Sequence, residues 1–553
     1  MKRVFLLLFL ACTLQANAQQ SWSWLASPNA QGNMAHLGVD MDPVGNVYSI
    51  GRMYQSATFG NITLSSPYQY FTMYLAKQGQ NGEYLFAKRI MSDAGITSAV
   101  VKVDNNGNSY IYGTCNGYKL HFTDNDSISY STSLSNTDQT KLFLAKYDVN
   151  GNFIWAKKGE GPLMYATARA ITINGSDLYI GGEYYGNGNF LGINLPNKTS
   201  NASCIIKVNT SNGNGVWLNA ANVTAMTYIT AITHDGTNLY ACGKFQNTIG
   251  FDNVNVTNPL FTGGGERIFL FKFDNNGTAV WGKEEGGIAN YMTTATDGNN
   301  PNCLAVDGSG NLFMGGSYQD DAGTINNKLQ KPFLSKYSTT DGTKAWTVNY
   351  SSAIENAING IAIDSNSNPI VVGEYIGTMS LGTTSLVPDP NARKGFIARI
   401  DKANGNTVSA NTIGEMNRKV ALHHITIAEN KASYVISGTY SASLTLGLHN
   451  VTSTGNNTDF TAKYALGTGS SIAKRVRSVA KVYPNPASNY INYQLTTTGT
   501  HQISVVNYIG QVLLIEKGNG TSGKLDIASL PAGNYNLRIV SDNEISFTPF
   551  VKN

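Results

Sequence analysis

One short segment recurs seven times along the chain, and this repetition constrains the fold more than any other feature. Each copy consists of a polar turn, a β-rich run and a glycine, as in GNVYSIGRM and GNLFMGGSY. These marker glycines lie between 57 and 73 residues apart, at Gly51, Gly113, Gly182, Gly243, Gly316, Gly373 and Gly438. Such a period is typical of folds in which one supersecondary unit packs against copies of itself.

Each repeat carries a second signature downstream of the glycine, as in FLAKYDVNGNFIWAK. It predicts two strands joined by a polar, glycine-containing turn. Together with the apolar run before the marker glycine, a repeat therefore contains four strands. The third strand carries a cation, at Lys77, Lys146, Lys207, Lys272, Lys336, Arg399 and Lys463. The fourth often carries tryptophan, at Trp155, Trp217, Trp281 and Trp346, for which we expect packing between units rather than a sugar-binding surface.

Seven four-stranded units predict an all-β fold, a seven-bladed β-propeller over residues 19–467. Packing around a ring buries both faces of every sheet, whereas the alternative, a β-helix, has shorter rungs. The seventh repeat ends at DFTAKYALGTGSS without its fourth strand, and the N-terminal SWSWLAS has the pattern of that strand. We expect residues 21–27 to pair near Phe460–Tyr464 and close the ring. The alternative is a polar N-terminal arm.

The repeats resemble a bacterial β-propeller repeat of secreted proteins with the pattern F-x-x-K-x-D-x-x-G-x-x-x-W. The match is clearest at Phe143, Lys146, Asp148, Gly151 and Trp155. The resemblance covers residues 21–467 and implies the fold, but little about activity.

The first 18 residues have the pattern of a secretory signal peptide. Lys2 and Arg3 precede an apolar core, and Ala16-Asn17-Ala18 is a cleavage site of small residues. A lipoprotein signal with Cys12 is the alternative, although the residues before Cys12 fit it poorly. The whole chain has a net charge of +4, and loss of Lys2 and Arg3 leaves a charge too small to attract a polyanion over long range. We therefore expect no nucleic-acid partner. No stretch after the signal peptide reaches the roughly 18 apolar residues that a membrane span needs, so we expect no transmembrane span, and we expect a monomer.

Four cysteines remain after the signal peptide, namely Cys115, Cys204, Cys242 and Cys303. Their wide spacing favours small buried residues in strands. A disulfide between Cys204 and Cys242 is left open, because an exported protein meets an oxidising compartment.

The composition changes after Gly467. Residues 468–480 are small, polar and basic, which is typical of a linker, and alternating runs in 481–553 predict a small C-terminal β-sandwich. This tail resembles the type A C-terminal sorting domain of the type IX secretion system. The residues that carry the resemblance include Tyr483, Pro484, Asn485, Pro486, Gly533, Tyr535 and Lys552. The resemblance implies passage through the periplasm to the outer-membrane surface or the medium, with the secretion machinery as a partner. It leaves open whether the tail is cleaved and whether the remaining chain is anchored or released.

No motif for a nucleophile, a catalytic metal or a phosphate-binding loop is present in the sequence. We therefore expect no cofactor. Calcium is a weak alternative at the turn Asp104, Asn106 and Asn108, since alternating oxygens can ligate it, but no bidentate Glu follows. His423 and His424 are adjacent, so in a regular strand they face opposite sides and cannot share a metal.

Equivalent positions of the repeats form a ring in a propeller. Near the start of the innermost strand they are His36, Ser98, Thr167, Thr230, Asn302, Asn359 and His423. These polar residues predict a ligand ring at one mouth of the central channel, with a water-lined wall as the alternative. We expect a non-catalytic binding or adhesion protein for an extracellular glycan or protein. The alternatives are a polysaccharide- or protein-degrading enzyme with catalytic groups in loops such as 121–139 and 284–301, or a surface spacer.

Overall fold

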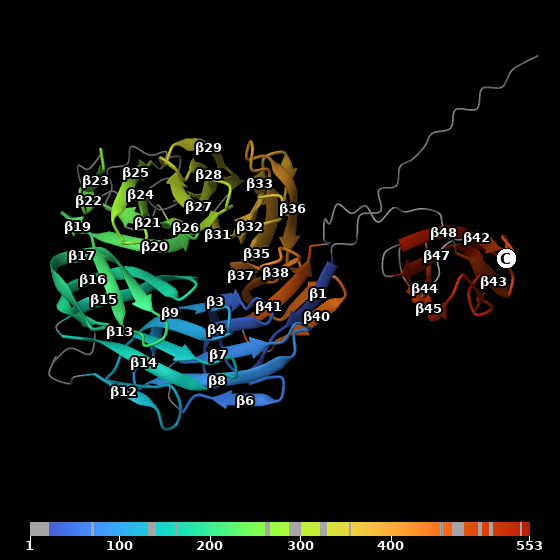
Figure 1. Ribbon diagram of the computed structural model, residues 1–553, viewed down its shortest axis with the longest axis horizontal. Helices are drawn as coiled ribbons and strands as arrows, with labels where there is room; N and C mark the ends of the chain where they lie inside the picture. The colour runs from blue at the N-terminus through green and yellow to red at the C-terminus, as the bar shows by residue number, and fades with distance from the viewer. Residues whose placement is uncertain are drawn as a thin grey trace, which may run out of the picture. The chain divides into compact units, whose positions relative to one another are not determined.

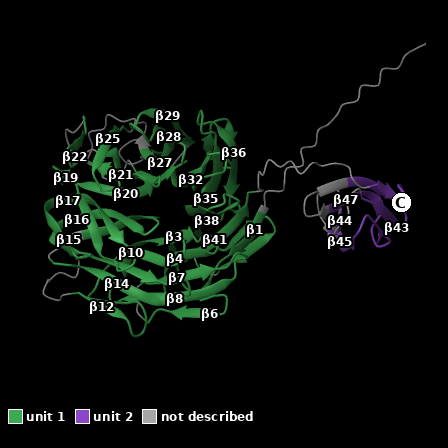
Figure 2. Cartoon of the chain, viewed as in Figure 1, with its two compact units in different colours: residues 1–467 green, residues 468–553 purple. Residues whose placement is uncertain are grey.

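A computed structural model describes most of the chain as two compact units, residues 1–467 and 468–553 (Figure 2). The described residues are 21–67, 71–130, 140–161, 163–259, 266–286, 300–320, 329–352, 356–453, 455, 457–466, 481–495, 500–507, 512–541 and 545–553. Throughout these ranges the regular structure is β-strand, which confirms the predicted all-β class. Within them no helix has the length and apolarity needed to cross a membrane. The predicted signal peptide and the linker at 468–480 lie outside the described residues.

Unit 1 repeats one antiparallel four-stranded sheet, and seven copies can be followed in its described residues. Sheet 1 contains β3 (Met34–Met41), β4 (Val47–Met53), β7 (Thr72–Gln78) and β8 (Tyr84–Ser92). Sheet 2 contains β9 (Ile96–Val103), β10 (Ser109–Cys115), β13 (Lys141–Tyr147) and β14 (Phe153–Glu160). Sheet 3 contains β15 (Leu163–Asn174), β16 (Asp177–Phe190), β17 (Ile193–Asn209) and β18 (Gly215–Ala220). Sheets 4 and 5 contain β20 (Thr227–His234), β21 (Leu239–Phe245), β24 (Arg267–Phe273) and β25 (Ala279–Glu285); and β26 (Asn300–Val306), β27 (Asn311–Asp320), β28 (Leu329–Ser338) and β29 (Lys344–Asn349). Sheets 6 and 7 contain β31 (Ala357–Ile363), β32 (Pro369–Gly377), β35 (Asp389–Ile400) and β36 (Thr407–Ile413); and β37 (Val420–Ile427), β38 (Ser433–Tyr440), β41 (Thr458–Ala465) and β1 (Ser21–Ala26).

The first strands of neighbouring sheets contact one another in a closed order. β3 contacts β9, β9 contacts β15, and the series continues through β20, β26, β31 and β37 back to β3. Figure 1 shows the sheets arranged around a centre, with the first strands innermost. This is the architecture of a β-propeller, and it joins the two ends of unit 1 through contacts between β3 and β37.

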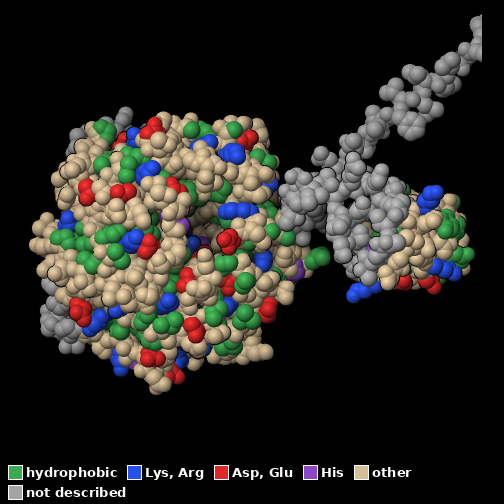
Figure 3. Space-filling view, viewed as in Figure 1, with side chains coloured by type: hydrophobic (Ala, Val, Ile, Leu, Met, Phe, Trp, Pro, Cys, Tyr) green, Lys and Arg blue, Asp and Glu red, His purple; other side chains and the backbone are tan. Residues whose placement is uncertain are grey.

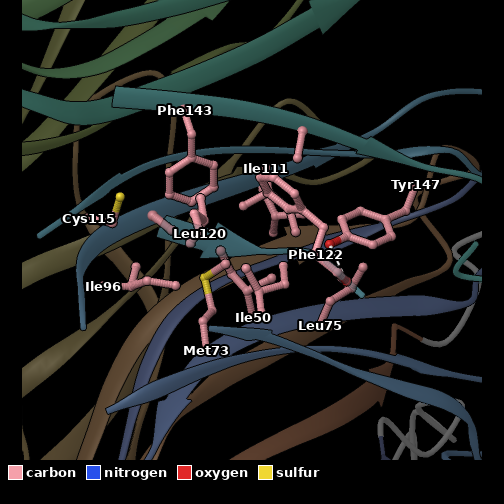
Figure 4. Close-up of a cluster of buried hydrophobic side chains, with 14 of the residues drawn as sticks. Ile50, Met73, Leu75, Ile96, Ile111, Cys115, Leu120, Phe122, Phe143 and Tyr147 are labelled. Atoms are coloured by element: carbon pink, nitrogen blue, oxygen red, sulfur yellow. Dashed lines mark hydrogen bonds between the residues drawn. The ribbon is translucent and has the colours of Figure 1, made fainter. Parts of the chain in front are cut away.

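Hydrophobic clusters fill the spaces between neighbouring sheets. Between sheets 1 and 2, Ile50, Met73 and Leu75 pack against Ile111 and Phe143 (Figure 4). Equivalent clusters join each remaining pair of neighbours, including sheets 7 and 1. Burial of both faces of every sheet is the main favourable free-energy term for such a stack.

The repeated tryptophans lie in these interfaces. The fourth-strand aromatic of one sheet covers a glycine with positive φ in the turn between the third and fourth strands of the next sheet. The pairs are Trp24 with Gly82, Phe86 with Gly151, Trp155 with Gly213, Trp217 with Gly277, Trp281 with Gly342 and Trp346 with Gly405. The tryptophans are therefore packing residues between sheets rather than exposed sugar platforms.

The repeated lysines bridge the same interfaces. Lys146 Nζ donates to the Thr210 carbonyl at 3.0 Å and Lys272 Nζ to the Thr339 carbonyl at 2.8 Å, each in the turn of the next sheet. In the seventh sheet β1 lies antiparallel to β41, and Trp24 pairs with Lys463 as Trp155 pairs with Lys146 in the second. The N-terminal strand thus occupies the fourth-strand position of sheet 7.

A second set of short strands, farther from the ring centre, connects neighbouring sheets. The sequence analysis did not predict these strands. Hairpins follow the second strands: β5 (Ser56–Phe59) with β6 (Ile62–Ser65), β11 (Lys119–His121) with β12 (Ser127–Ser129), β22 (Thr248–Phe251) with β23 (Val254–Thr257), β33 (Met379–Leu381) with β34 (Thr384–Ser385), and β39 (Ser443–Leu446) with β40 (His449–Thr452). Four of them pair with the segment that ends or follows the fourth strand of the preceding sheet, namely β2 (Asn29–Ala30), β8, β19 (Asn222–Val223) and β30 (Ser351–Ser352).

Unit 2 consists of two antiparallel sheets with one shared core. The first contains β42 (Lys481–Tyr483), β43 (Tyr490–Gln494) and β46 (Ser522–Asp526), and the second β45 (Val512–Asn519), β44 (Thr500–Asn507), β47 (Gly533–Ser541) and β48 (Ile545–Lys552). Ile491 and Leu525 of the first sheet join Val505, Leu537 and Phe550 of the second in one buried cluster. Unit 2 therefore has a hydrophobic core of its own.

Candidate ligand site at the inner strands

The first strand of each described sheet in unit 1 carries a β-bulge. The unpaired residues are Leu37, Thr97, Arg169, Thr230, Asn302, Asn359 and His423. A bulge breaks the alternation of a strand and redirects one side chain. The bulges thus set which residues of the innermost strands form a ring.

The bulge also explains the marker glycine. A Cβ at Gly243 would lie closer than 3.0 Å to the backbone carbonyl of Tyr228, just before the bulge of β20. The same clash with a carbonyl arises at Gly182, Gly316, Gly373 and Gly438. Only glycine lets the bulged strand approach its neighbour this closely, so at these five positions the repeated glycine is the sequence signal of the bulge, whereas at Gly51 and Gly113 a Cβ would first meet side chains.

The predicted ring residues lie at or beside these bulges. Thr230, Asn302, Asn359 and His423 are the bulged residues themselves. His36 precedes the bulged Leu37, Ser98 follows Thr97, and Thr167 lies two residues before Arg169. His36 and Thr167 are buried, whereas the other five are partly buried. The structure therefore brings all seven to the same end of the inner strands, and their role toward a ligand stays a prediction.

Four of these side chains bond the next sheet, at the backbone carbonyl that precedes its bulge. Asn302 Nδ2 donates to the Ile358 carbonyl at 3.0 Å and Asn359 Nδ2 to the Leu422 carbonyl at 2.9 Å. The hydroxyl of Ser98 donates to the Ala168 carbonyl at 3.2 Å, and the hydroxyl of Thr230 donates to the Pro301 carbonyl. These polar residues link the sheets into a belt.

Two arginines extend this belt on sheets 1 to 3. Arg52 Nη1 donates to the Ile96 and Thr97 carbonyls of sheet 2, each at 3.3 Å. Arg169 directs Nε and Nη2 at Glu183 Oε1, at 3.1 and 3.0 Å. The Arg169 side chain is 40% exposed and that of Glu183 is fully buried. Burial raises the pKa of Glu183, although the Arg169 guanidinium acts in the opposite direction.

A buried polar cluster lies where sheet 7 meets sheet 1. His36 Nδ1 is 3.7 Å from Asp459 Oδ2, which also accepts a short hydrogen bond from the Tyr74 hydroxyl. The His36 and His424 ring centroids are 5.4 Å apart. The sequence analysis did not single out Asp459. The corresponding position of the second repeat holds the apolar Leu142, and a charged residue at a position that is apolar in another repeat is the signal that could have identified Asp459.

The adjacent histidines differ from the expectation for a regular strand. The bulge at His423 interrupts the alternation, and the two rings lie 6.5 Å apart. Burial, with smaller contributions from His36 and Arg393, lowers the pKa of His423 to about 4. Burial also lowers the pKa of His424 well below its ordinary value, and the nearby His36 acts in the same direction. Both imidazoles are therefore neutral at neutral pH.

The turn aspartates bond their own turns. Asp104 Oδ1 accepts from the N–H groups of Asn106 and Asn108 at 2.9 and 2.8 Å, and Oδ2 accepts from Asn108 Nδ2 at 2.8 Å. Both oxygens are thus used by an Asx turn. In the part of the chain that the structure describes, no three His, Cys, Asp or Glu side chains are grouped to hold a metal. The calcium alternative stays untested.

All four predicted cysteines are free and buried. The disulfide considered between Cys204 and Cys242 is absent. Burial raises the pKa of both thiols to about 12. They are small core residues, as the spacing favoured.

The sorting-motif residues of unit 2 join its two ends. Asn485 Oδ1 accepts from the Val551 N–H at 2.9 Å, and its Nδ2 donates to the Pro549 carbonyl at 3.2 Å. Tyr535 stacks on Phe550 and donates its hydroxyl to the Pro531 carbonyl. Lys552 is buried, whereas Tyr483 is 49% exposed. Pro484 and Pro486 both follow cis peptide bonds, and Gly533 begins β47.

Comparison with known proteins identifies this tail. Residues 481–553 match the secretion system C-terminal sorting domain. An uncharacterized WD repeat-containing protein of Acanthamoeba polyphaga mimivirus is 24% identical over 396 residues, which span 66% of this chain and 26% of that protein. The chain thus matches about a quarter of the length of this relative.

Two solved structures resemble the chain at low similarity. Quinohemoprotein alcohol dehydrogenase from Comamonas testosteroni has 10% identity and a TM-score of 0.34, with 84% of this chain and 79% of that chain covered. Kuenenia stuttgartiensis hydrazine synthase has 11% identity and a TM-score of 0.29, with 54% and 72% covered. The tail, in contrast, is a type IX secretion sorting domain, and it directs the protein to the outer-membrane surface or the medium.

Proposed function

We propose that this protein is an exported seven-bladed β-propeller that binds an extracellular glycan or protein without chemically changing it. The propeller spans residues 19–467 and is closed by residues 21–27. The sorting domain is a small sandwich over residues 481–553, and the mature protein is a monomer. The closed contact order of the seven inner strands and the pairing of β1 with β41 support this architecture.

One observation carries the binding role. The bulges of the inner strands converge at one end of the ring, where they hold polar and cationic side chains in place through hydrogen bonds between neighbouring sheets. Figure 3 shows a hollow near the centre of unit 1, with charged and histidine side chains at its edge. A rigid polar rim around a hollow is the kind of surface that binds a ligand without a conformational step.

The experiment is a binding screen of the purified mature protein. We expect retention of one glycan class on an array of extracellular polysaccharides, or of one protein from the cell surface, with no product released. Mass spectrometry of the incubated polymer measures release directly. Turnover of any polymer would replace the binding role by the enzymatic alternative. Of the loops suggested for that alternative, 121–139 and 284–301, residues 131–139 and 287–299 lie outside the described residues.

A further inference from the structure

We propose that the ligand is an acidic polysaccharide, and that Arg52 and Arg169 bind its carboxylate or sulfate groups at the start of β9. This inference rests on the proposed function, because it names the chemical class of the ligand for the same ring. Carboxylate and sulfate share the planar or trigonal oxygen pairs that a guanidinium recognises through two parallel hydrogen bonds.

Arg169 has the geometry of an anion-binding residue. It is the bulged residue of the innermost strand β15, so the bulge sets its direction. Glu183 holds the guanidinium through Nε and Nη2, both directed at Oε1. The carboxylate is fully buried and the arginine side chain is 40% exposed. The cation is therefore fixed in position and also reaches solvent.

Arg52 contacts the neighbouring inner strand, β9. Its Nη1 donates to the carbonyls of Ile96 and Thr97, at the start of β9, and this end of the interaction is exposed at Thr97. Burial lowers the pKa of Arg52 and the nearby Asp459 acts to raise it. The guanidinium is thus held by two neutral carbonyls and lies 5.3 Å from the centre of the Phe71 ring, with Asp459 as a nearby negative charge.

Hydrogen bonds connect the two arginines through sheet 2. Arg52 binds the Thr97 carbonyl, the adjacent Ser98 donates to the Ala168 carbonyl, and Ala168 precedes Arg169. Thr97 is exposed between them, and its hydroxyl donates to the Thr114 carbonyl at 3.2 Å, which leaves its oxygen as an acceptor. Two guanidinium groups and a hydroxyl on three consecutive sheets suit an extended chain that carries acidic groups and free hydroxyls.

At this end of the sheets, several ion pairs differ in how deeply their two charges are buried. In three ion pairs the carboxylate is more buried than its cation: Arg169 with Glu183, Arg393 with Glu374, and Lys244 with Glu266, with side-chain exposures of 40% against 0%, 36% against 16% and 13% against 5%. Arg267 with Glu284, at the same end of sheet 4, has the opposite order, with exposures of 13% against 23%. The pairs are formally neutral, but at Arg169 a ligand meets the exposed cation before the buried carboxylate, so the local field there is positive although the chain as a whole is almost uncharged.

The test measures binding of the mature protein to three immobilised probes, a polyuronate, a sulfated polysaccharide and a neutral glucan. We expect binding to one or both acidic polymers and a steep loss of affinity as salt rises. Arg169→Gln and Arg52→Gln each weaken binding at least tenfold, and Arg169→Lys weakens it less. Lys88→Gln on the fourth strand β8 removes the same charge and serves as the matched control, with affinity unchanged.

The outcomes separate the two proposals. Binding of the neutral glucan with no effect of either arginine substitution overturns the acidic ligand and leaves the binding function standing. Binding of an acidic polymer that salt does not weaken also overturns the role of the arginines, even where a variant fails to fold. Polymer turnover overturns the proposed function itself. A thermal melt of each variant shows whether a loss of affinity reflects unfolding.

Discussion

The indole of Trp24 covers Gly82 so closely that a Cβ at Gly82 would lie 2.8 Å from the ring. Trp24 is near the N-terminus and belongs to sheet 7, whereas Gly82 lies in the turn between β7 and β8 of sheet 1. Its indole Nε1 also donates to the Gln80 carbonyl at 2.8 Å. This one contact repeats the Trp155–Gly213 contact between sheets 2 and 3, and it joins the last sheet to the first.

Trp24→Ala is therefore expected to destabilise unit 1 as strongly as loss of a core tryptophan. The substitution removes a buried ring and leaves a cavity between sheets, which costs about 3–5 kcal/mol. Urea denaturation followed by circular dichroism measures the change. Ser23→Ala, on the same strand and exposed, should stay within about 0.5 kcal/mol of the wild type. Equal midpoints for the two variants would contradict the role of Trp24.

Two neighbouring glycines on β16 test the account of the bulge. Gly182→Ala places a Cβ against the Thr167 carbonyl, whereas Gly181→Ala meets only side-chain atoms of Ile229 and Ile232, at 3.1 Å and beyond. We expect Gly182→Ala to cost about 1–3 kcal/mol through overpacking, and Gly181→Ala clearly less. Thermal melts of the two variants measure the difference in stability. A larger loss of stability in Gly181→Ala than in Gly182→Ala would contradict this account of the bulge.

The fold was largely predictable from the sequence because the residues that pack one repeat against the next recur in every repeat. The marker glycine, the third-strand lysine and the fourth-strand tryptophan recur at equivalent places since each contacts the next unit in the same way. The N-terminal SWSWLAS segment carries Trp24 in that pattern, and so its pairing with the Lys463 strand could be expected before the structure was seen.

The candidate site was less predictable because bulges shift the alternation of a strand by one residue. In β9 the shift lies between the partners of Thr114 and Cys115, whereas in the other inner strands it follows the residue paired with the marker glycine. Arg169 could not be singled out without the bulge. Asp459 lies far from His36 in sequence, and only closure of the ring brings their side chains together.

The neutral histidines predict a loss of stability in mild acid. The pKa of His423 is lowered from 6.5 to about 4 by burial, so below pH 6.5 the unfolded chain takes up a proton that the folded chain does not. Stability therefore falls as pH drops from 6.5 towards 4 and levels off below the folded pKa, by up to about 1.4 kcal/mol per pH unit for each such histidine. Chemical denaturation at stepped pH measures the slope.

His423→Asn should flatten this pH dependence, because it removes one imidazole that burial holds neutral. The remaining slope in His423→Asn reflects His424, whose pKa burial also lowers. An identical slope in the wild type and His423→Asn would show that His423 is not held neutral by the fold.

The thiols are expected to be inert until the protein unfolds. Because burial raises the pKa of Cys204 and Cys242 to about 12, almost no thiolate is present at pH 8, and the thiolate is the reactive form. A chromogenic disulfide reagent should react slowly with the native mature protein and label Cys115, Cys204, Cys242 and Cys303 in denaturant. Only two reactive thiols in non-reducing denaturant would reveal a disulfide.

Asn485 offers a test of how the sorting domain is held together. Its amide bonds the Val551 N–H and the Pro549 carbonyl, and so it fixes the final strand β48 against the segment after β42. Asn485→Ala removes two exposed hydrogen bonds, worth about 1 kcal/mol together. We expect lower stability of unit 2 and a several-fold rise in the fraction of the protein retained in the periplasm of a host with type IX secretion. Gln494→Ala, exposed on β43, is the matched control for both readouts.

Cell fractionation followed by immunoblotting compares periplasm, outer membrane and medium. Normal export of Asn485→Ala despite a measured loss of stability would mean that the secretion machinery does not depend on the hydrogen bonds between Asn485 and β48.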